Sequence, residues 1–357
     1  MATAHQNLQI QKFKEINLSD PFFDSLKNDY AEFSDWFSKK GESQAYLFKT
    51  DDGWLEGFLY LKIEEGVDND IHPSLPMAKR LKIGTFKINP HGTRLGERFL
   101  KRAFDMATSN YVNSLYVTVF EKHSALVELF LKYGFQKIGT KITNNGTESV
   151  FERRIDVISG DVVLDYPRIP LQKDRHFLLS IYPQWHSRLL PDSLLATESS
   201  SILQDVSHTN SIHKIYLTSM SGVSNLRRGD TLLIYRTQDG GAAYYTSVVT
   251  SICVVEDLLH ISRFTTELDF KEYCQPYSVF NNIELTKFYK EKRYPWLIRF
   301  TYNIALTKRL NRKILIEKVG LPTNKYWGFL QISTENFKTI VKLSDDYEKT
   351  RSIVHPS

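Results

Sequence analysis

The sequence predicts an α+β protein in two parts: a mixed, twisted sheet flanked by helices, followed by a small β-barrel. Its 357 residues are more than one small core can organise. Up to about residue 157, segments with strand patterns alternate with segments of helical period. From about residue 175 onward, short runs rich in β-branched and aromatic residues are bounded by turn residues, which predicts an all-β core with few helices.

The first part is divided by clear turn and period signals. Apolar residues at helical spacing predict a helix over 20–40, and Asp52-Gly53 predicts the turn of a β-hairpin. The elements expected after the hairpin are a strand at 80–88, a helix starting within 88–107, a strand at 114–120, a helix at 124–134 and two strands around Asn145-Gly146.

Periodicity is lost between residues 158 and 175, where Pro167 and Pro170 fall, and we place a linker there. The domains are therefore expected at 1–157 and 176–357. The strands expected in the second part are 175–183, 212–219, 230–237, 242–256, 294–307 and 326–333. Helices are expected only near 266–276, near 284–291 and after Ser333-Thr334, with Thr334 as the cap, which favours a barrel or a strongly curved sheet.

Composition narrows the class of protein. The two cysteines, Cys253 and Cys274, imply no disulfide framework and fit a reducing cytoplasm. No apolar run approaches the roughly 20 residues of a membrane span, and the polar N-terminus lacks the apolar core of a signal peptide. We find no metal-ligand spacing, nucleophile elbow, P-loop or dinucleotide fingerprint, so we expect no metal site. Together with the cysteine content and the lack of apolar segments, the composition predicts a cytoplasmic protein without a membrane partner.

The net charge of +5 lies entirely in the second part. Residues 1–157 carry 21 basic and 21 acidic groups, and the rest of the chain carries 25 and 20. A basic second part is a mild indication of a polyanionic partner, although surplus lysines also serve simply to solvate a surface.

The stretch "INPHGTRLGERFLKRAFDMA" (88–107) joins a glycine-containing turn to a helix. An apolar stripe that includes Leu95 and Phe99 is expected to face the core, and the basic residues to lie on the other side. Gly92 and Gly96 free the backbone where the helix begins, so its unpaired N–H groups are available to an anion. A solvated basic helix after a turn is the alternative interpretation.

With its context, this stretch resembles the GNAT acyltransferase superfamily. The family's signature Arg/Gln-x-x-Gly-x-Gly/Ala lies between its fourth strand and third helix, where this chain has "HGTRLG" (91–96). A second landmark of the family, a helix that ends in Gly-Phe, is matched by "HSALVELFLKYGF" (123–135). The resemblance covers roughly residues 8–156.

The resemblance implies acetyl-CoA (CoA) as the cofactor. Its pyrophosphate would lie on the amides of residues 92–97, and its pantetheine arm beside strand 84–88, in a gap between the fourth and fifth strands. An N–H of 86–88 would polarise the thioester, and an acceptor amine, deprotonated by a carboxylate or through water, would attack it directly. The cofactor-binding residues so implied are Phe86, Lys87, Ile88, Gly92, Thr93, Arg94, Leu95, Gly96, Glu97 and His123.

Two positions depart from the family pattern. Arg94 replaces the first signature glycine, and Phe130 replaces a tyrosine that often protonates the leaving thiolate. Tyr133 is an alternative acid, although three residues along a helix turn it by about 300°. Glu64 and Glu121 occupy strand positions from which a base could point into the cleft.

The second part resembles the PUA-like superfamily (PUA, ASCH and EVE modules) over roughly 175–343, on "SNLRRGDTLLIYRT" (224–237) and its flanking strands. The ASCH-type Gly-x-Lys-x-x-Glu signature is not found. Such modules commonly bind RNA or modified bases, by cations for phosphate and by rings for stacking. The candidate RNA-binding residues are Trp185, Lys214, Arg227, Arg228, Arg236, Tyr244 and Trp296, although the core is the more common place for each aromatic.

These features predict an acetyl-CoA-dependent N-acyltransferase that acts on an amine, with RNA or aminoacyl-tRNA, as for toxin-like members, among the expected acceptors. One alternative is a CoA-binding RNA regulator with little turnover, which the phenylalanine at the acid position motivates. Another is a protein or small-amine acetyltransferase whose second part only forms a homodimer or shapes the acceptor cleft.

Overall fold

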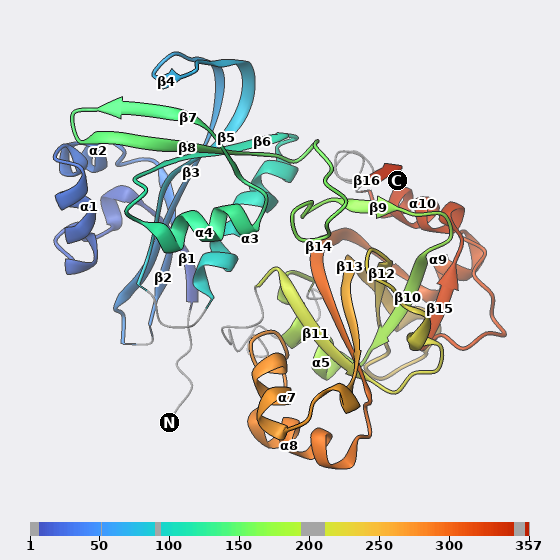
Figure 1. Ribbon diagram of the computed structural model, residues 1–357. Helices are drawn as coiled ribbons and strands as arrows, with labels where there is room; N and C mark the ends of the chain where they lie inside the picture. The colour runs from blue at the N-terminus through green and yellow to red at the C-terminus, as the bar shows by residue number, and fades with distance from the viewer. Residues whose placement is uncertain (1–6, 51, 90–93, 194–210, 346–353, 357) are drawn as a thin grey trace. The chain divides into compact units, whose positions relative to one another are not determined.

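The computed structural model describes residues 7–50, 52–89, 94–193, 211–345 and 354–356 (Figure 1). The described residues up to Val157 form one compact unit, unit 1, and those from Ile158 onward form a second, unit 2. Each unit is built around its own mixed sheet.

Within the described residues, unit 1 contains an eight-stranded sheet in the order β1-β2-β3-β5-β6-β8-β7-β4. Neighbouring strands are antiparallel except β5 and β6, which run parallel. The strands are β1 (Asn7–Lys12), β2 (Gln44–Lys49), β3 (Leu55–Asp68), β4 (Ile71–His72), β5 (Leu75–Ile88), β6 (Ser114–Val119), β7 (Gln136–Thr143) and β8 (Gly146–Arg154).

Helices cover both faces of this sheet. On one face the ring of Phe86 in β5 packs against Phe99 and Phe130, with centroids 5.5 and 5.6 Å apart. On the other face Tyr60 of β3 packs against Phe13 and Trp36. The first face carries α3 (Leu95–Ser109) and α4 (Ser124–Lys132), and the second carries η1 (Phe13–Glu15), η2 (Pro21–Phe23), α1 (Asp24–Asp29) and α2 (Phe33–Lys39).

The predicted hairpin and the later strand–helix order of unit 1 are confirmed, but the single helix predicted over 20–40 is wrong. The segment forms η2, α1 and α2 instead. Tyr30 has extended backbone angles (φ −132°, ψ 102°), which end α1 and turn the chain before α2 begins. The break matters because it brings the side chain of Tyr30 over the sheet.

Unit 2 has, within its described residues, a six-stranded sheet in the order β11-β14-β13-β12-β10-β15. β10 and β12 run parallel and the other neighbours antiparallel. The strands are β10 (His176–Ile181), β11 (His213–Thr218), β12 (Thr231–Arg236), β13 (Val248–His260), β14 (Trp296–Asn311) and β15 (Phe329–Ile332).

The predicted closed barrel is not confirmed. The outer strands β11 and β15 do not pair with each other in the described part of the chain, so the sheet stays open and curves through bulges in β13 and β14. Around it lie α5 (Pro183–Leu189), η3 (Pro191–Ser193), η5 (Val223–Asn225), α6 (Ala243–Thr246), η6 (Ile261–Arg263), α7 (Glu267–Cys274), α8 (Asn282–Glu291), α9 (Arg312–Glu317) and α10 (Thr334–Leu343).

Helix caps fix several of these boundaries. The N-cap of α10 is Ser333, whose side chain accepts a hydrogen bond from the N–H of Asn336, and not Thr334 as expected. Asn281 forms a capping box with Glu284 at the start of α8. Such caps satisfy N–H groups that no helix can pair internally.

The segment 158–175, expected as a linker, is packed into unit 2. Tyr166 and Ile169 are buried, and the hydroxyl of Tyr166 donates to the carbonyl of Tyr302 at 3.0 Å. Within the same segment β9 (Ile169–Leu171) pairs in parallel with β16 (Val354–Pro356). Its two prolines therefore mark an irregular but ordered part of the unit.

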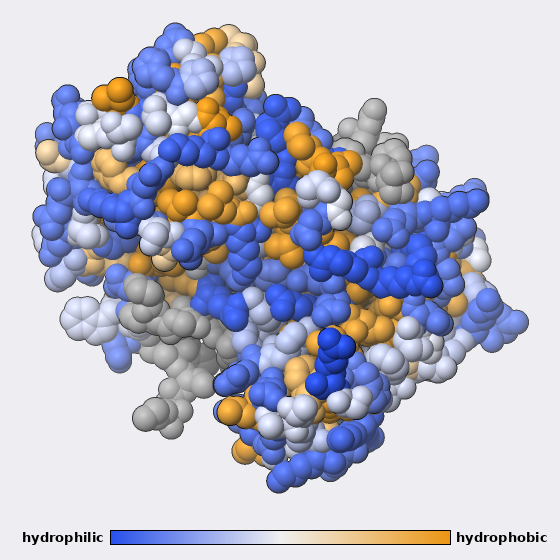
Figure 2. Space-filling view, in the orientation of Figure 1, coloured by the Kyte–Doolittle hydropathy of each residue, from blue (hydrophilic) through white to orange (hydrophobic). Residues whose placement is uncertain are grey.

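The face shown in Figure 2 is mostly hydrophilic, with hydrophobic residues in small patches, as is usual for folded domains. No helix within the described residues has the length and apolar character needed to cross a bilayer.

Candidate functional site

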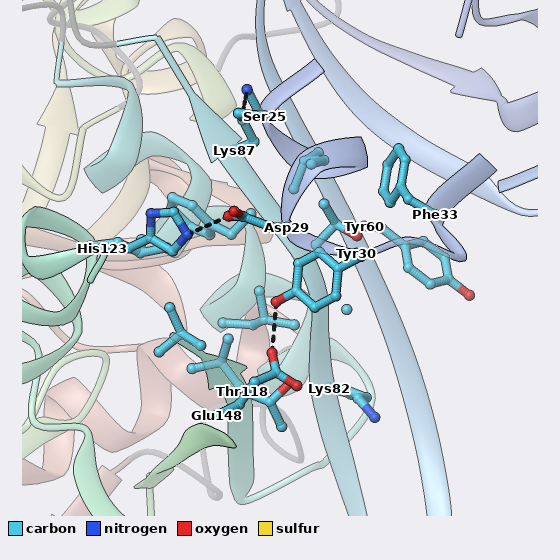
Figure 3. Close-up of a pocket in the computed structure, with 18 of the residues that line it drawn as sticks. Ser25, Asp29, Tyr30, Phe33, Tyr60, Lys82, Lys87, Thr118, His123 and Glu148 are labelled. Atoms are coloured by element: carbon cyan, nitrogen blue, oxygen red, sulfur yellow. Dashed lines mark hydrogen bonds and ion pairs between the residues drawn. The ribbon is translucent and has the colours of Figure 1, made fainter. Parts of the chain in front are cut away.

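β5 and β6 separate after a short parallel pairing. Leu81–Ile83 pair with Leu115–Val117, whereas β5 continues to Ile88 and β6 to Val119. Among the described residues, the edge of β5 from Gly84 onward therefore has no strand partner on the β6 side. This free edge borders a cavity of about 680 Å³ (Figure 3), a volume typical of a small-molecule site.

A β-bulge lies where the two strands part. The pairing of β5 with β3 skips Gly84, which falls between the pairs Tyr60–Thr85 and Leu61–Ile83. Glycine is needed because a Cβ at this position would lie 2.7 Å from Cδ1 of Tyr60. The extra residue shifts the alternation of side chains by one position along β5.

As a result, Lys82, Thr85 and Lys87 all project from the sheet face that carries α1 and α2. Lys87 donates to Oγ of Ser25 in α1, and Lys82 pairs in register with Tyr116 of β6. Figure 3 shows Lys82 and Lys87 around the cavity together with residues from α1, β6 and β8, and Thr85 also lines it. The cavity is therefore walled by charged and aromatic groups on this face.

A buried acid–phenol pair lies in the cavity wall. The hydroxyl of Tyr30 donates to Oε1 of Glu148 in β8 at 2.7 Å, and Glu148 is buried (Figure 3). Burial and this hydrogen bond raise the pKa of Tyr30 above its ordinary value. The phenol thus stays protonated, and the carboxylate of Glu148 has further lone pairs that can accept a hydrogen bond.

A second ion cluster lies at the start of α4. Asp29 accepts from Lys122 and lies 2.9 Å from Nε2 of His123, as Figure 3 shows for the histidine. Burial alone would raise the pKa of Asp29, but the contacts with Lys122 and His123 outweigh it and hold that pKa below its usual value. His123, an expected cofactor contact, lines the cavity in this pairing.

The expected bases differ in placement. Glu64 lines the cavity and accepts hydrogen bonds from Tyr116 and from Lys62 at 3.0 Å. Burial raises the pKa of Glu64, yet Tyr116 and the nearby lysines bring it below the ordinary value. Glu121 lies outside the cavity lining, tied to Lys137 at 2.6 Å and Ser149 at 2.8 Å.

The expected acid is also away from the cavity. Tyr133 caps the end of α4, is fully buried and is not part of the cavity lining. Phe130 is fully buried between Phe86 and Phe135, so that position supplies packing and no hydroxyl.

The start of α3 lies in sequence directly after the free edge of β5. Arg94, the N-cap, has a left-handed backbone (φ 55°), and its carbonyl accepts from the N–H of Glu97. The N–H groups of Leu95 and Gly96 belong to the first turn, which has no intrahelical acceptor for them. A Cβ at Gly96 would lie 2.7 Å from Cδ2 of Leu129 in α4, so this glycine permits close helix packing.

The remaining expected cofactor contacts divide into three groups. Phe86, Lys87 and Ile88 line the cavity. Glu97 is buried and is held by Arg94 at 3.4 Å and Lys132 at 2.9 Å. Gly92 and Thr93 lie outside the described residues.

The expected exposed basic face of α3 is wrong at two positions. Arg98 is 1% exposed, with its guanidinium 4.7 Å from the ring centroid of Phe48, and Lys101 is 4% exposed and pairs with Asp105 at 2.8 Å. Both cations are buried and contact neighbouring side chains, so they are not available at the surface to bind a phosphate group.

Sequence patterns missed Tyr30, Asp29, Lys82 and Glu148. Tyr30 lies in the segment 20–40, whose apolar spacing predicts a continuous helix, and the other three carry no local motif. They meet only because the broken helix segment folds over the sheet and the bulge reorients β5.

The expected RNA-binding residues of unit 2 are not brought together on its surface. Lys214 and Arg236 are buried, with Lys214 5.8 Å from the ring centroid of Tyr302. Trp185 and Trp296 pack against the hydrophobic core. Burial removes Lys214 and Arg236 from contact with an RNA backbone, whereas Trp185 and Trp296 are partly buried and use part of their ring surface in core packing.

The other three lie nearer the surface. Arg227 is exposed, and Arg228 is exposed but pairs with Asp161 at 2.8 Å and donates to the carbonyl of Glu256. Tyr244 donates to Glu317 at 2.6 Å.

The described residues contain no group of three or more His, Cys, Asp or Glu side chains placed to hold a metal ion. Both cysteines are buried, and no disulfide joins them.

No protein-family model matches this chain, and no curated protein matches it. Among solved structures, a mutant of the ZmASCH protein from Zymomonas mobilis is 9% identical and covers 48% of this chain and 99% of its own, with a TM-score of 0.32. The yncA protein of Salmonella typhimurium, solved with its cofactor acetyl-CoA, is 10% identical and covers 44% and 97%, with a TM-score of 0.33. A GNAT-family acetyltransferase from Listeria monocytogenes is 16% identical and covers 41% and 94%, with a TM-score of 0.26.

Proposed function

We propose that this chain is an acetyl-CoA-dependent N-acyltransferase. One observation carries the proposal: β5 leaves β6 after Ile83, and its free edge then follows a cavity of about 680 Å³. A free strand edge offers alternating N–H and C=O groups, which suit the amides of a pantetheine arm. An N–H on the same edge can polarise a thioester carbonyl.

The first turn of α3 suits the diphosphate of the donor. The N–H groups of Leu95 and Gly96 carry the positive end of the helix dipole. Arg94 and Lys132 add two positive charges against the single buried carboxylate of Glu97. The balance at this helix start therefore favours an anion.

Glu148 is the base that the geometry favours. It is buried in the cavity wall, and Tyr30 holds it in place, so it can take a proton from an acceptor ammonium before the amine attacks. A thiol has a pKa near 8.5, so the thiolate leaves without a dedicated acid. The phenylalanine at position 130 is consistent with such a reaction.

The test compares two identical substitutions on neighbouring strands. Thr118 lines the cavity in β6, whereas Thr147 is exposed in β8 and lies outside the cavity lining. Thr118→Trp should fill the gap and weaken CoA binding at least tenfold by calorimetry, while Thr147→Trp should leave it unchanged. Equal affinity in both variants, at matched melting temperatures, would remove the cavity as the donor site.

A CoA-binding regulator is the second candidate, favoured by the absence of a tyrosine hydroxyl at position 130 and by the burial of Tyr133. Release of free thiol from acetyl-CoA separates the two. Thiol release that increases with an added amine supports the transferase, and stimulation by bulk tRNA would identify an RNA-linked acceptor. CoA binding without thiol release on any amine supports the regulator.

A further inference from the structure

The cavity wall contains more lysines than donor binding requires. Six of them line it: Lys40, Lys62, Lys82, Lys87, Lys122 and Lys141. Amines in an acyl-transfer cavity are potential acyl acceptors, so their protonation and bonding decide which one can react.

Four of these amines are tied to neighbours. Lys62 pairs with Glu64, Lys122 with Asp29 and Lys141 with Asp70, and Lys87 donates to Oγ of Ser25. Lys40 lies 5.9 Å from the ring centroid of Tyr60. A lysine in an ion pair must lose that pairing before its nitrogen lone pair can attack.

Lys82 differs from the four tied lysines, and it differs from Lys40 in lying where β5 and β6 separate. It forms no hydrogen bond or ion pair within 4 Å with the part of the chain that the structure describes, and its ammonium nitrogen lies 5.3 Å from the ring centroid of Tyr116. Burial lowers the pKa of Lys82 below its ordinary value, and the charges of Lys141 and Lys62 act in the same direction. Glu64 and Asp68 oppose this shift without cancelling it.

The bulge gives Lys82 its direction. Lys82 lies two residues before Gly84, at the point where β5 and β6 separate, and it projects from the same face as Thr85. In Figure 3 its side chain lies on the same side of the cavity as Thr118 and Glu148. Without the extra residue at Gly84, the alternation would turn Lys82 toward the opposite face.

We propose that Lys82 is an internal acyl acceptor, which the chain acetylates from acetyl-CoA bound in its own cavity. This inference rests on the proposed function. The bond that forms joins Nζ of Lys82 to the acetyl carbon, and the thioester C–S bond breaks with its electron pair on sulfur. The amine loses one proton and the thiolate gains one, so the products are an acetyl-lysine side chain and free CoA.

Acetylation changes the acceptor end of the cavity. The amide that forms is stable and neutral, and its acetyl group occupies space between β5 and β6 that an external amine needs. Self-acetylation therefore acts as a brake, which engages when the donor is present and the external acceptor is absent.

The full chain incubated with isotope-labelled acetyl-CoA, then digested and analysed by mass spectrometry, tests this proposal. Label should enter Lys82 at least tenfold faster than Lys318, an exposed lysine of unit 2. Thr118→Trp should abolish the selectivity but leave Lys318 unaffected. The labelling rate of Lys82, plotted against pH, should also reach its maximum at a lower pH than the labelling rate of Lys318, because the pKa of Lys82 is lowered.

A second readout separates this proposal from the proposed function. Incubation with acetyl-CoA alone should lower the later turnover of an external amine several-fold for the native chain. Lys82→Arg, compared with its own untreated sample, should show no such loss. Turnover of an external amine with Lys82 unlabelled would overturn self-acetylation and leave the transferase intact. Absence of CoA binding would overturn both.

Discussion

Within the described residues, the main sheet of each unit contains one parallel strand pair, and the two pairs behave differently. In unit 2, β10 and β12 stay in register over six residue pairs, from His176–Thr231 to Ile181–Arg236. In unit 1, β5 and β6 pair over only three residue pairs and then diverge. The residues of β10 and β12 are buried throughout, whereas β5 carries a bulge and exposed positions. A site thus arises where a parallel pairing stops early, without any special sequence motif at that point.

The two units also treat buried charge differently. In unit 1 the carboxylates near the gap line a cavity that a ligand can enter. In unit 2, Glu256 is buried, accepts from Arg299 at 3.0 Å and contacts Nδ1 of His213, and Asp230 is buried against Arg175. Carboxylates that line a cavity can exchange protons with a ligand, whereas carboxylates buried against Arg or His side chains contribute to the stability of the fold.

The largest expected effect tests the structural role of charge in unit 2. Glu256→Gln removes the charge that both Arg299 and His213 contact, and breaking a buried pair of this kind costs about 3–5 kcal/mol. Denaturant unfolding should show that loss in free energy. CoA affinity should be unchanged, since the cavity lining lies in unit 1.

Glu272→Gln is the matched control, because Glu272 is exposed and its substitution should alter stability by less than about 0.5 kcal/mol. Similar stability of the two variants would show that the buried contacts of Glu256 are not stabilising.

The next effect concerns catalysis in unit 1. Glu148→Gln removes the proposed base and should lower the rate of acetyl transfer about 100-fold with CoA affinity unchanged. Glu152→Gln is the control on the same strand, outside the cavity lining. Steady-state thiol release gives the rate of acetyl transfer, and calorimetry gives the CoA affinity. Equal rates for the two variants would exclude Glu148 as the base.

Some elements of unit 1 could be predicted from the sequence alone, and several of the cavity-lining residues could not. Turn residues and helical or alternating period identified the hairpin at Asp52-Gly53 and the strand–helix order after residue 80 in unit 1, because these signals are local. The direction of the Lys82 side chain could not be found that way. Simple alternation along 80–88 puts Lys82 on the face of Phe86, and only the register with β3 reveals the bulge that reverses it.

Burial was the second obstacle. Arg98 and Lys101 were expected on a solvated helix face, and Lys214 and Arg236 on an RNA-binding surface, but all four are buried. A helical or strand period identifies the apolar face of an element. It does not show whether another part of the chain packs over the polar face. Long cationic side chains are readily covered when a ring or a carboxylate lies beside them, as Phe48 lies beside Arg98.

A smaller effect tests the tight parallel pair of unit 2 by pH. His176 at the start of β10 is fully buried, stacked 4.3 Å from the ring of Phe337, and burial lowers its pKa to about 4. The unfolded chain has a histidine pKa near 6.5, so stability from neutral His176 is complete above that pH and is lost as pH falls toward 4. Between pH 7.5 and pH 5 the loss should be about 2 kcal/mol. His176→Phe should flatten this part of the curve in denaturant unfolding, and an unchanged slope would contradict the burial of a neutral ring.

The smallest effect decides whether unit 2 has an RNA-binding surface at all. Of the expected residues, Arg227 is exposed, and the side chain of Arg228 is engaged by Asp161. Arg227→Glu should weaken binding of bulk tRNA a few-fold and reduce the salt dependence by about one counterion. Arg263→Glu makes the same charge change at another exposed position of unit 2 and should have a smaller effect. Because the two variants have equal net charge, equal losses would reflect the overall charge of the chain, and unit 2 would then have no localised RNA site at Arg227.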